Sequence, residues 1–238
     1  MVRSMSSFTT TFILILYFLL FPIWIVNVTL SQVLIAYAVY WFLFDFIQSA
    51  YMHRWAAHNL WNPPKWVQYF GATVGILSLI SSPIGWAAWH RTHHAHSDTE
   101  KDPHSPVYKS FWHIVFNYKY HDFEPRRGID RMRNKYFAFI LKHEALIVIV
   151  GNLLIFAVLP FQWFLTLWAI PVAFMVLNTN FLINFVQHKN GEPTNNPIFW
   201  PILFSEVYHK SHHNKPKMSY TKWDPAGWII SKLGWTHE

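Results

Sequence analysis

Histidine is the residue type best placed to do chemistry in this chain, because 15 of the 238 residues are histidine and none is cysteine. The absence of cysteine excludes disulfides, thiolate nucleophiles, zinc–thiolate sites and iron–sulfur clusters. Nine histidines fall into spaced groups: His53 and His58 (H-x4-H), His90, His93 and His94 (H-x2-H-H), the single His188, and His209, His212 and His213 (H-x2-H-H). Neutral imidazoles without thiolates suit zinc, copper, iron or nickel.

The spacings fit helices that point several rings at one place. On an α-helix, H-x2-H-H puts three rings within about a 100° arc, while the adjacent pair can splay toward two different metals. Asn184 and His188 are four residues apart and share a helical face. His53 and His58, in contrast, would lie about 140° apart on an α-helix. We therefore expect the helix that carries them to end or distort there.

The number of histidines predicts two metals rather than one. A structural zinc is satisfied by four ligands, whereas nine histidines suit two metals with four or five ligands each and room for oxygen or water. Two redox metals beside a membrane favour iron and dioxygen, although the residue types alone leave zinc open. The other six histidines match no such spacing and are predicted to be structural: His96, His104, His113, His121, His143 and His237.

The elements that must position these residues are membrane helices. The chain is 53% hydrophobic and 13% charged, against about 25% charged residues in a soluble domain. Four stretches are apolar enough to cross a bilayer, residues 8–28, 33–51, 145–159 and 163–185, and short links join them into two hairpins. The sequence predicts one all-α integral membrane domain over residues 1–238, with an interfacial helix and a cytoplasmic helical cap (52–144 and 186–238) that carries the histidines.

The basic residues predict the orientation of this domain. Net charge is +7, and all 19 Lys and Arg residues lie at Arg3, between Arg54 and Lys142, or between Lys189 and Lys232. By the positive-inside rule, these segments and all nine histidines face the cytoplasm, so the excess charge indicates membrane lipid rather than nucleic acid as partner. A fifth crossing at residues 66–86 would break this rule. We expect an interfacial helix there, ended by Ser81, Ser82, Pro83 and Gly85.

At its histidine groups the sequence resembles the membrane fatty acid desaturases of the stearoyl desaturase type. Residues 90–106 (HRTHHAHSDTEKDPHSP) are similar to that family's second histidine box, and residues 184–191 (NFVQHKNG) to its N-x3-H-x2-G element. Residues 209–216 (HKSHHNKP) and 222–234 resemble the third box and the tail after it. Residues 53–58 (HRWAAH) resemble the first box, closest to bacterial acyl desaturases. The similarity runs from about residue 33 to 235.

The resemblance implies a di-iron centre and an oxygen-dependent reaction. It implies that the nine histidines bind two iron ions and that Asn184 reaches the metal through a water. It also implies that O2 and two electrons, from a donor such as ferredoxin or cytochrome b5, convert a saturated acyl chain to one with a cis double bond near its middle. Lys210 and Ser211 replace a common Asn pair, and residues 110–120 follow the family loosely. The acyl carrier (CoA, carrier protein or lipid) therefore stays open.

Asp45 and a cluster of basic residues each have two possible interpretations. Asp45 lies inside a span and is spaced by four from Ser49 and again from His53, so it is either a hydrogen-bonding partner of His53 or a wetted carboxylate near the interface. A basic cluster either recognises a phosphate-bearing carrier or the electron donor, or anchors the protein to the membrane surface. Its members are Arg126, Arg127, Arg131, Arg133 and Lys135.

Two competing functions are consistent with parts of the sequence. A hydroxylase or ketolase would use the same kind of metal centre on a lipid. A metal transporter would use the histidines to gather its cargo, but it needs polar residues along a path through the membrane. Apart from Asp45, the predicted spans supply almost none.

Overall fold

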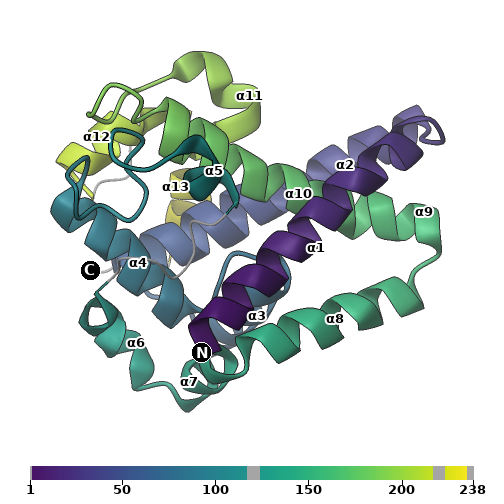
Figure 1. Cartoon of the computed structure of the whole chain (residues 1–238), viewed down its shortest axis with the longest axis horizontal. Coiled ribbons are helices and arrows are strands. Elements are labelled where there is room, and N and C mark those ends of the chain that lie inside the picture. Colours follow the sequence, from purple (N-terminus) through teal and green to yellow (C-terminus); the bar gives the residue numbers. More distant parts are fainter. Residues whose placement is uncertain (1, 117–123, 217–222, 235–238) are drawn as a thin grey trace.

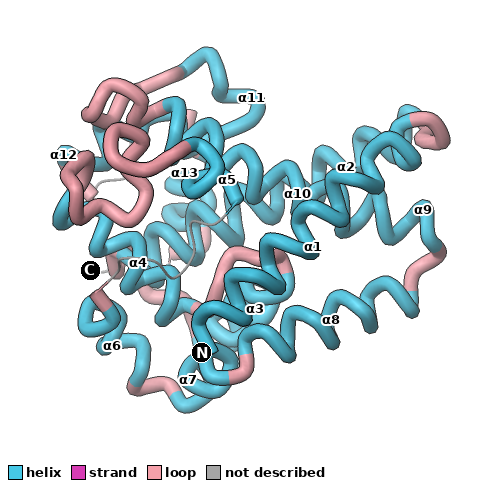
Figure 2. The backbone as a smooth tube through the Cα atoms, viewed as in Figure 1, coloured by secondary structure: helices cyan, strands magenta, loops and turns pink. Residues whose placement is uncertain are grey.

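A computed structural model describes residues 2–116, 124–216 and 223–234, and every regular element within these ranges is helical (Figure 2). The apolar body is built from α1 (Val2–Ile25), α2 (Leu30–Trp41) with its continuation η1 (Phe42–Ala57), α8 (Glu144–Val158), and the run α9 (Phe161–Phe164), η3 (Leu165–Ala169), α10 (Ile170–Leu177) and η4 (Asn178–Val186). Their long axes run side by side across the molecule (Figure 1).

Three of these helices are long and apolar enough to cross a membrane: Phe8–Ile25, Leu30–Ala57 and Phe161–Val186. A fourth crossing results if α7 (Lys135–Lys142) and α8, which meet at 83°, count as one bent span. The second span runs to Ala57 rather than to residue 51, so His53 lies on the membrane helix itself. The predicted helical membrane architecture is confirmed at this level.

The body buries one polar side chain, Asn152, that is hydrogen-bonded to several helices (the Asn152 hub), and it exposes apolar side chains outward. Asn152 on α8 accepts hydrogen bonds from the Tyr17 hydroxyl (2.6 Å) and the Trp168 indole (2.7 Å). Its amide nitrogen donates to the carbonyls of Leu77 and Val148. Because no water competes inside a bilayer, these bonds tie α1, α3 (Lys65–Leu77), α8 and η3 together. Leu19, with 67% of its surface exposed, is typical of the outer, lipid-facing side chains.

Short helices gather at one end of this body and form a cap (Figure 1). They are α3 (Lys65–Leu77), α4 (Pro83–His96), α5 (Phe111–Phe116), η2 (Pro125–Gly128), α6 (Ile129–Met132), η5 (Pro197–Phe199), α11 (Trp200–Leu203), η6 (Phe204–Tyr208), α12 (His209–Asn214) and α13 (Pro225–Lys232).

The stretch predicted as one interfacial helix, residues 66–86, is divided between two helices. The first, α3, ends at Leu77, and Leu79 takes a left-handed conformation (φ 66°) that turns the chain. Ser82 then caps α4 by accepting a hydrogen bond from the Gly85 amide. With 13 residues, α3 is about 20 Å long and too short to span a bilayer. The break matters because it starts α4 in the direction that carries its histidines inward.

Candidate metal centre

The first pair of histidines lies on a π-helix. The η1 segment forms i→i+5 hydrogen bonds, and this ladder extends to the cap residue, where the His58 amide donates to the His53 carbonyl (3.2 Å). Residues five apart then lie on nearly the same face, and the centroids of the two imidazole rings are 5.1 Å apart. The distortion expected between His53 and His58 is therefore present, as a wider helix that aligns both rings.

The remaining seven histidines come from three other segments that meet η1. His90, His93 and His94 lie on α4, which packs along η1. His188 follows the end of η4, and His209, His212 and His213 lie on α12. Segments that are more than 100 residues apart in the chain are thus brought to one place.

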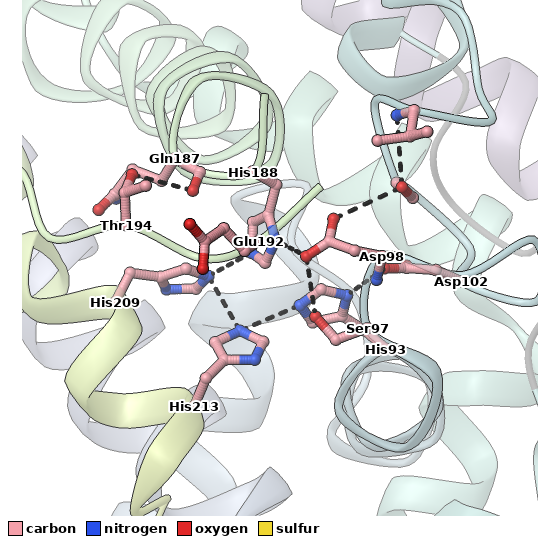
Figure 3. Close-up of polar contacts among 12 residues, drawn as sticks. His93, Ser97, Asp98, Asp102, Gln187, His188, Glu192, Thr194, His209 and His213 are labelled. Atoms are coloured by element: carbon pink, nitrogen blue, oxygen red, sulfur yellow. Dashed lines mark hydrogen bonds and ion pairs between the residues drawn. The ribbon is translucent and has the colours of Figure 1, made fainter. Parts of the chain in front are cut away.

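The nine rings form two groups, and the ligand atoms within each group lie within 4.8 Å of one another. One group of five contains His53, His58, His90, His94 and His212; one group of four contains His93, His188, His209 and His213. The adjacent residues His93 and His94 divide between the groups, as do His212 and His213. Figure 3 shows the four rings of the second group pointing toward a common centre.

Three carboxylates fix which nitrogen of a ring faces inward. The Nδ1–H groups of His53, His93 and His188 donate to Glu206 (2.9 Å), Asp102 (2.9 Å) and Asp98 (2.8 Å). The Nε2 atoms of these rings therefore carry lone pairs. Each of them lies 2.7 to 3.2 Å from the Nε2 atom of another ring: His53 from His212, His93 from His213, and His188 from His209.

Inward-facing lone pairs on rings that carboxylates orient from behind are the arrangement expected around a metal. Sequence reasoning did not single out these three carboxylates. The only available signal was their closeness to the histidine groups in the chain, three residues before His209 for Glu206 and a few residues after His94 for the two aspartates.

Burial keeps the rings in the protonation state that metals require. Burial and the neighbouring imidazoles lower the pKa values of His90, His93, His209 and His212 well below the ordinary value of 6.5. Burial also lowers the pKa of His94 to about 3. Neutral imidazole is the form that ligates a metal, so the donor set fits two metal ions.

Asp45 and Asn184 were both predicted to act beside the histidines, but only Asn184 lies next to them. Asp45 accepts a hydrogen bond from the Ser205 hydroxyl (2.7 Å), and the carboxylate bonded to His53 is Glu206. Ser49, the middle residue of the predicted spacing, also donates to Glu206. Asn184 lines a cavity of about 20 Å³ together with His93 and His209, and its amide nitrogen has no hydrogen-bond partner within the described part of the chain. That volume holds about one water molecule.

Among the histidines predicted to be structural, His104 lies beside the centre. Its ring stacks on Trp89 with centroids 4.4 Å apart, and it forms a third small group with His93 and Asp102. His96 bonds Glu124 at 2.9 Å. His121 and His237 lie outside the described residues.

The predicted basic cluster is divided by the fold. Arg126 and Arg127 pair with Glu124. Arg131 turns inward and donates to the carbonyls of Trp55 and Ala56 at the end of η1. Arg133 is exposed on the surface.

Comparison with known proteins gives one consistent family. The sequence pattern of the fatty acid desaturase family matches residues 22–233. The sn-1 stearoyl-lipid 9-desaturase of Anabaena variabilis is 30% identical over 201 residues, which cover 79% of this chain and 73% of that enzyme. Delta-9 acyl-lipid desaturase 2 of Arabidopsis thaliana is 30% identical over 68% of this chain and 57% of its own length. The Acyl-CoA C20 Delta5-desaturase of Anemone leveillei is 29% identical over 75% and 62%.

Proposed function

Because the chain belongs to the fatty acid desaturase family, we propose that it is an oxidoreductase that introduces a cis double bond near the middle of a saturated fatty acyl chain. The observation that carries this proposal is the convergence of nine imidazoles in groups of five and four. Three of them are held by carboxylates so that their free lone pairs face inward.

The two groups would each hold one iron ion. His53, His58, His90, His94 and His212 would bind one, and His93, His188, His209 and His213 the other, with Asn184 reaching it through a water. When bound, the irons would supply the redox chemistry by which O2, two electrons and two protons remove two hydrogens from adjacent methylenes, with both oxygen atoms leaving as water. The electrons would come from a separate protein such as ferredoxin or cytochrome b5.

The protein's own task is to position the acyl chain and to exclude water. The small cavity beside the histidines has Trp86, Trp89 and Ile183 as its apolar walls. Its polar lining, besides histidines, consists of Gln48, Thr179, Asn184 and Glu206. Bulky apolar walls keep bulk water away and fix which methylene meets the centre, and such positioning accounts for much of the catalytic effect when the cofactor supplies the chemistry.

The proposed topology has four membrane spans in two hairpins with the centre on the cytoplasmic side. Residues 26–29 link the first pair, and residues 159–160 link α8 to α9. The nine histidines gather at the opposite end of the body, in and beside the cap (Figure 1). Neither hairpin link contains a Lys or Arg residue, which agrees with a cytoplasmic location of the opposite end under the positive-inside rule.

The competing functions have less support. The relatives are desaturases by name, with both lipid-linked and CoA-linked substrates among them, and none named here is a hydroxylase. A transporter needs ionisable groups along a path. The spans Phe8–Ile25 and Phe161–Val186 contain no acidic or basic residue, and Asn152 of α8 is fully occupied by hydrogen bonds.

Product analysis tests the proposal. The full chain is purified, supplied with ferrous iron, and incubated with O2, a reduced ferredoxin system, and either stearoyl-CoA or a stearoyl phospholipid. We expect a monounsaturated acyl product from at least one of the two substrates, and none from a His188→Ala control. Exclusive formation of hydroxy or keto products would contradict the assignment.

A further inference from the structure

A basic groove lies on the surface of the cap, away from the histidines. It is formed where the start of α3 faces the turn between α6 and α7, and its volume is about 680 Å³. Lys65, Arg131, Arg133 and Lys135 line it together with Trp55, Tyr69 and Tyr136. We call this feature the α3–α7 groove. Among the residues that the structure describes, Asp130 is the only carboxylate that lines it.

Three of the four cations of the α3–α7 groove have no side-chain partner among the described residues, whereas the fourth, Arg131, lies 3.7 Å from Asp130. Both oxygens of Asp130 are occupied by Arg91, at 2.7 and 3.0 Å. Lys65, Arg133 and Lys135 are exposed, and no hydrogen bond or ion pair joins their side chains to another described residue. Three cations thus face one groove without a counter-ion.

The fourth cation is held in place and stays charged. Arg131 donates to the carbonyls of Trp55 and Ala56, and its guanidinium carbon lies 4.3 Å from the centre of a Trp55 ring. Burial lowers its pKa to about 10, which leaves it protonated at neutral pH. Arg131 therefore forms the floor of the groove as a charged side chain paired with Asp130, while the three unpaired cations line its rim.

In the proposed four-span topology, the groove lies at the level of lipid headgroups. Because α7 meets α8 at 83°, the α7 part of this bent span is steeply inclined to α8 and runs close to the membrane surface. Beside the cations, α3 exposes Trp66 (65%), Phe70 (44%) and Tyr69 (42%), and α7 exposes Phe139 (54%). Exposed aromatic rings on helices that lie in the interface insert among acyl chains just below the headgroups.

From this juxtaposition of uncompensated cations and interfacial aromatic rings, we propose that the α3–α7 groove binds the phosphate headgroup of an anionic phospholipid. Lys and Arg side chains bind phosphate through charge-assisted hydrogen bonds, and basic pockets beside membrane helices bind anionic headgroups. A zwitterionic headgroup fits less well, because its ammonium would face cations and the one carboxylate is occupied by Arg91. The site is independent of the metal centre.

Lipid binding to the full, detergent-purified chain tests this proposal by native mass spectrometry. The groove variant carries Lys65→Gln, Arg133→Gln and Lys135→Gln. The matched control carries Lys101→Gln, Lys142→Gln and Lys232→Gln, which remove three exposed cations outside the groove. Each protein is titrated with phosphatidylglycerol and phosphatidylcholine of the same chain length, and an unchanged thermal unfolding temperature shows that each variant is folded.

We expect the unaltered chain to bind phosphatidylglycerol about tenfold more tightly than phosphatidylcholine. The groove variant should lose at least about tenfold of that affinity, since each interfacial cation contributes measurably to binding of anionic lipid. The control should change less than twofold. Equal affinity for the two lipids, or equal losses in the groove variant and the control, would overturn the proposal. Displacement of the lipid by inorganic phosphate at equal concentration would also overturn it, since the site would then recognise free phosphate.

Discussion

The carboxylates that accept hydrogen bonds from the histidine rings lead to a specific prediction, because two of them bind rings of different groups. Asp98 accepts from His188 of the group of four, and Glu206 accepts from His53 of the group of five. The replacements Asp98→Asn and Glu206→Gln keep the shape and remove the charge. Asp98 has a positive φ of 58°, a conformation that Asn adopts as readily as Asp. The backbone is therefore not the cause of any effect.

The expected magnitude follows from burial. The side chains of Asp98 and Glu206 are 5% and 6% exposed, so both hydrogen bonds are shielded from water. A hydrogen bond to a charged group is worth about 1.5–3 kcal/mol. Loss of such a partner typically weakens metal binding about 10- to 100-fold. Each variant should therefore weaken the binding of one metal by about that factor and leave the other unchanged.

The affinity for each of the two metals is measured by chelator titration of the iron- or cobalt-loaded chain, with the released metal counted per chain. Asp98→Asn and Glu206→Gln should each release one of two metals early, and the double variant should release both. The control is Glu192→Gln, which removes an exposed carboxylate that pairs with Lys210. The reasoning fails if the double variant still holds one metal as tightly as the unaltered chain, or if both variants behave like Glu192→Gln.

Four further outcomes are expected. His188→Ala should lower desaturation at least about 100-fold while the protein still inserts into membranes; near-normal turnover would remove His188 from the ligand set. Asn152→Leu should destabilise the detergent-solubilised protein by about 1–3 kcal/mol, because it leaves the Tyr17 hydroxyl and Trp168 indole unpaired; an unchanged unfolding temperature would exclude the hub. Gly71→Ala should cost about 1–3 kcal/mol, since its Cβ would lie 2.5 Å from the buried Tyr51 ring; thermal unfolding beside Thr73→Ala, a more exposed position on the same helix, tests this. Metal-free protein should lose stability between pH 7.5 and 5.5, because the unfolded histidines take up protons near pH 6.5 while folded His94 does so only at about pH 3; a flat profile of unfolding temperature would contradict this.

The nine histidines named from the sequence lie together in the structure, and this grouping could be predicted because the spacings are local. The H-x2-H-H groups occupy short helical segments, and the division of His93 from His94 follows from the angle between neighbouring residues on a helix. The distortion between His53 and His58 was likewise predictable from the helical angle. That this distortion takes the form of a π-helix was not predictable, because a π-helix depends on packing around the rings rather than on any residue type in η1.

The partners of the rings could not be predicted, because they depend on how distant segments meet. Asp45 has the right spacing from His53 along one helix, yet Glu206, 153 residues away, takes the position next to the ring. Arg131 looked like an exposed member of a basic run. It is instead the residue that binds the end of η1 through Trp55 and Ala56.

The most direct test of the central claim is anomalous X-ray diffraction at the iron edge from crystals of the full chain purified with its native metal. Two iron peaks per chain are predicted, one among His53, His58, His90, His94 and His212 and one among His93, His188, His209 and His213. A single peak, a peak bound by His104 and Asp102 instead, or a signal at the zinc edge alone would contradict a histidine-bound di-iron centre.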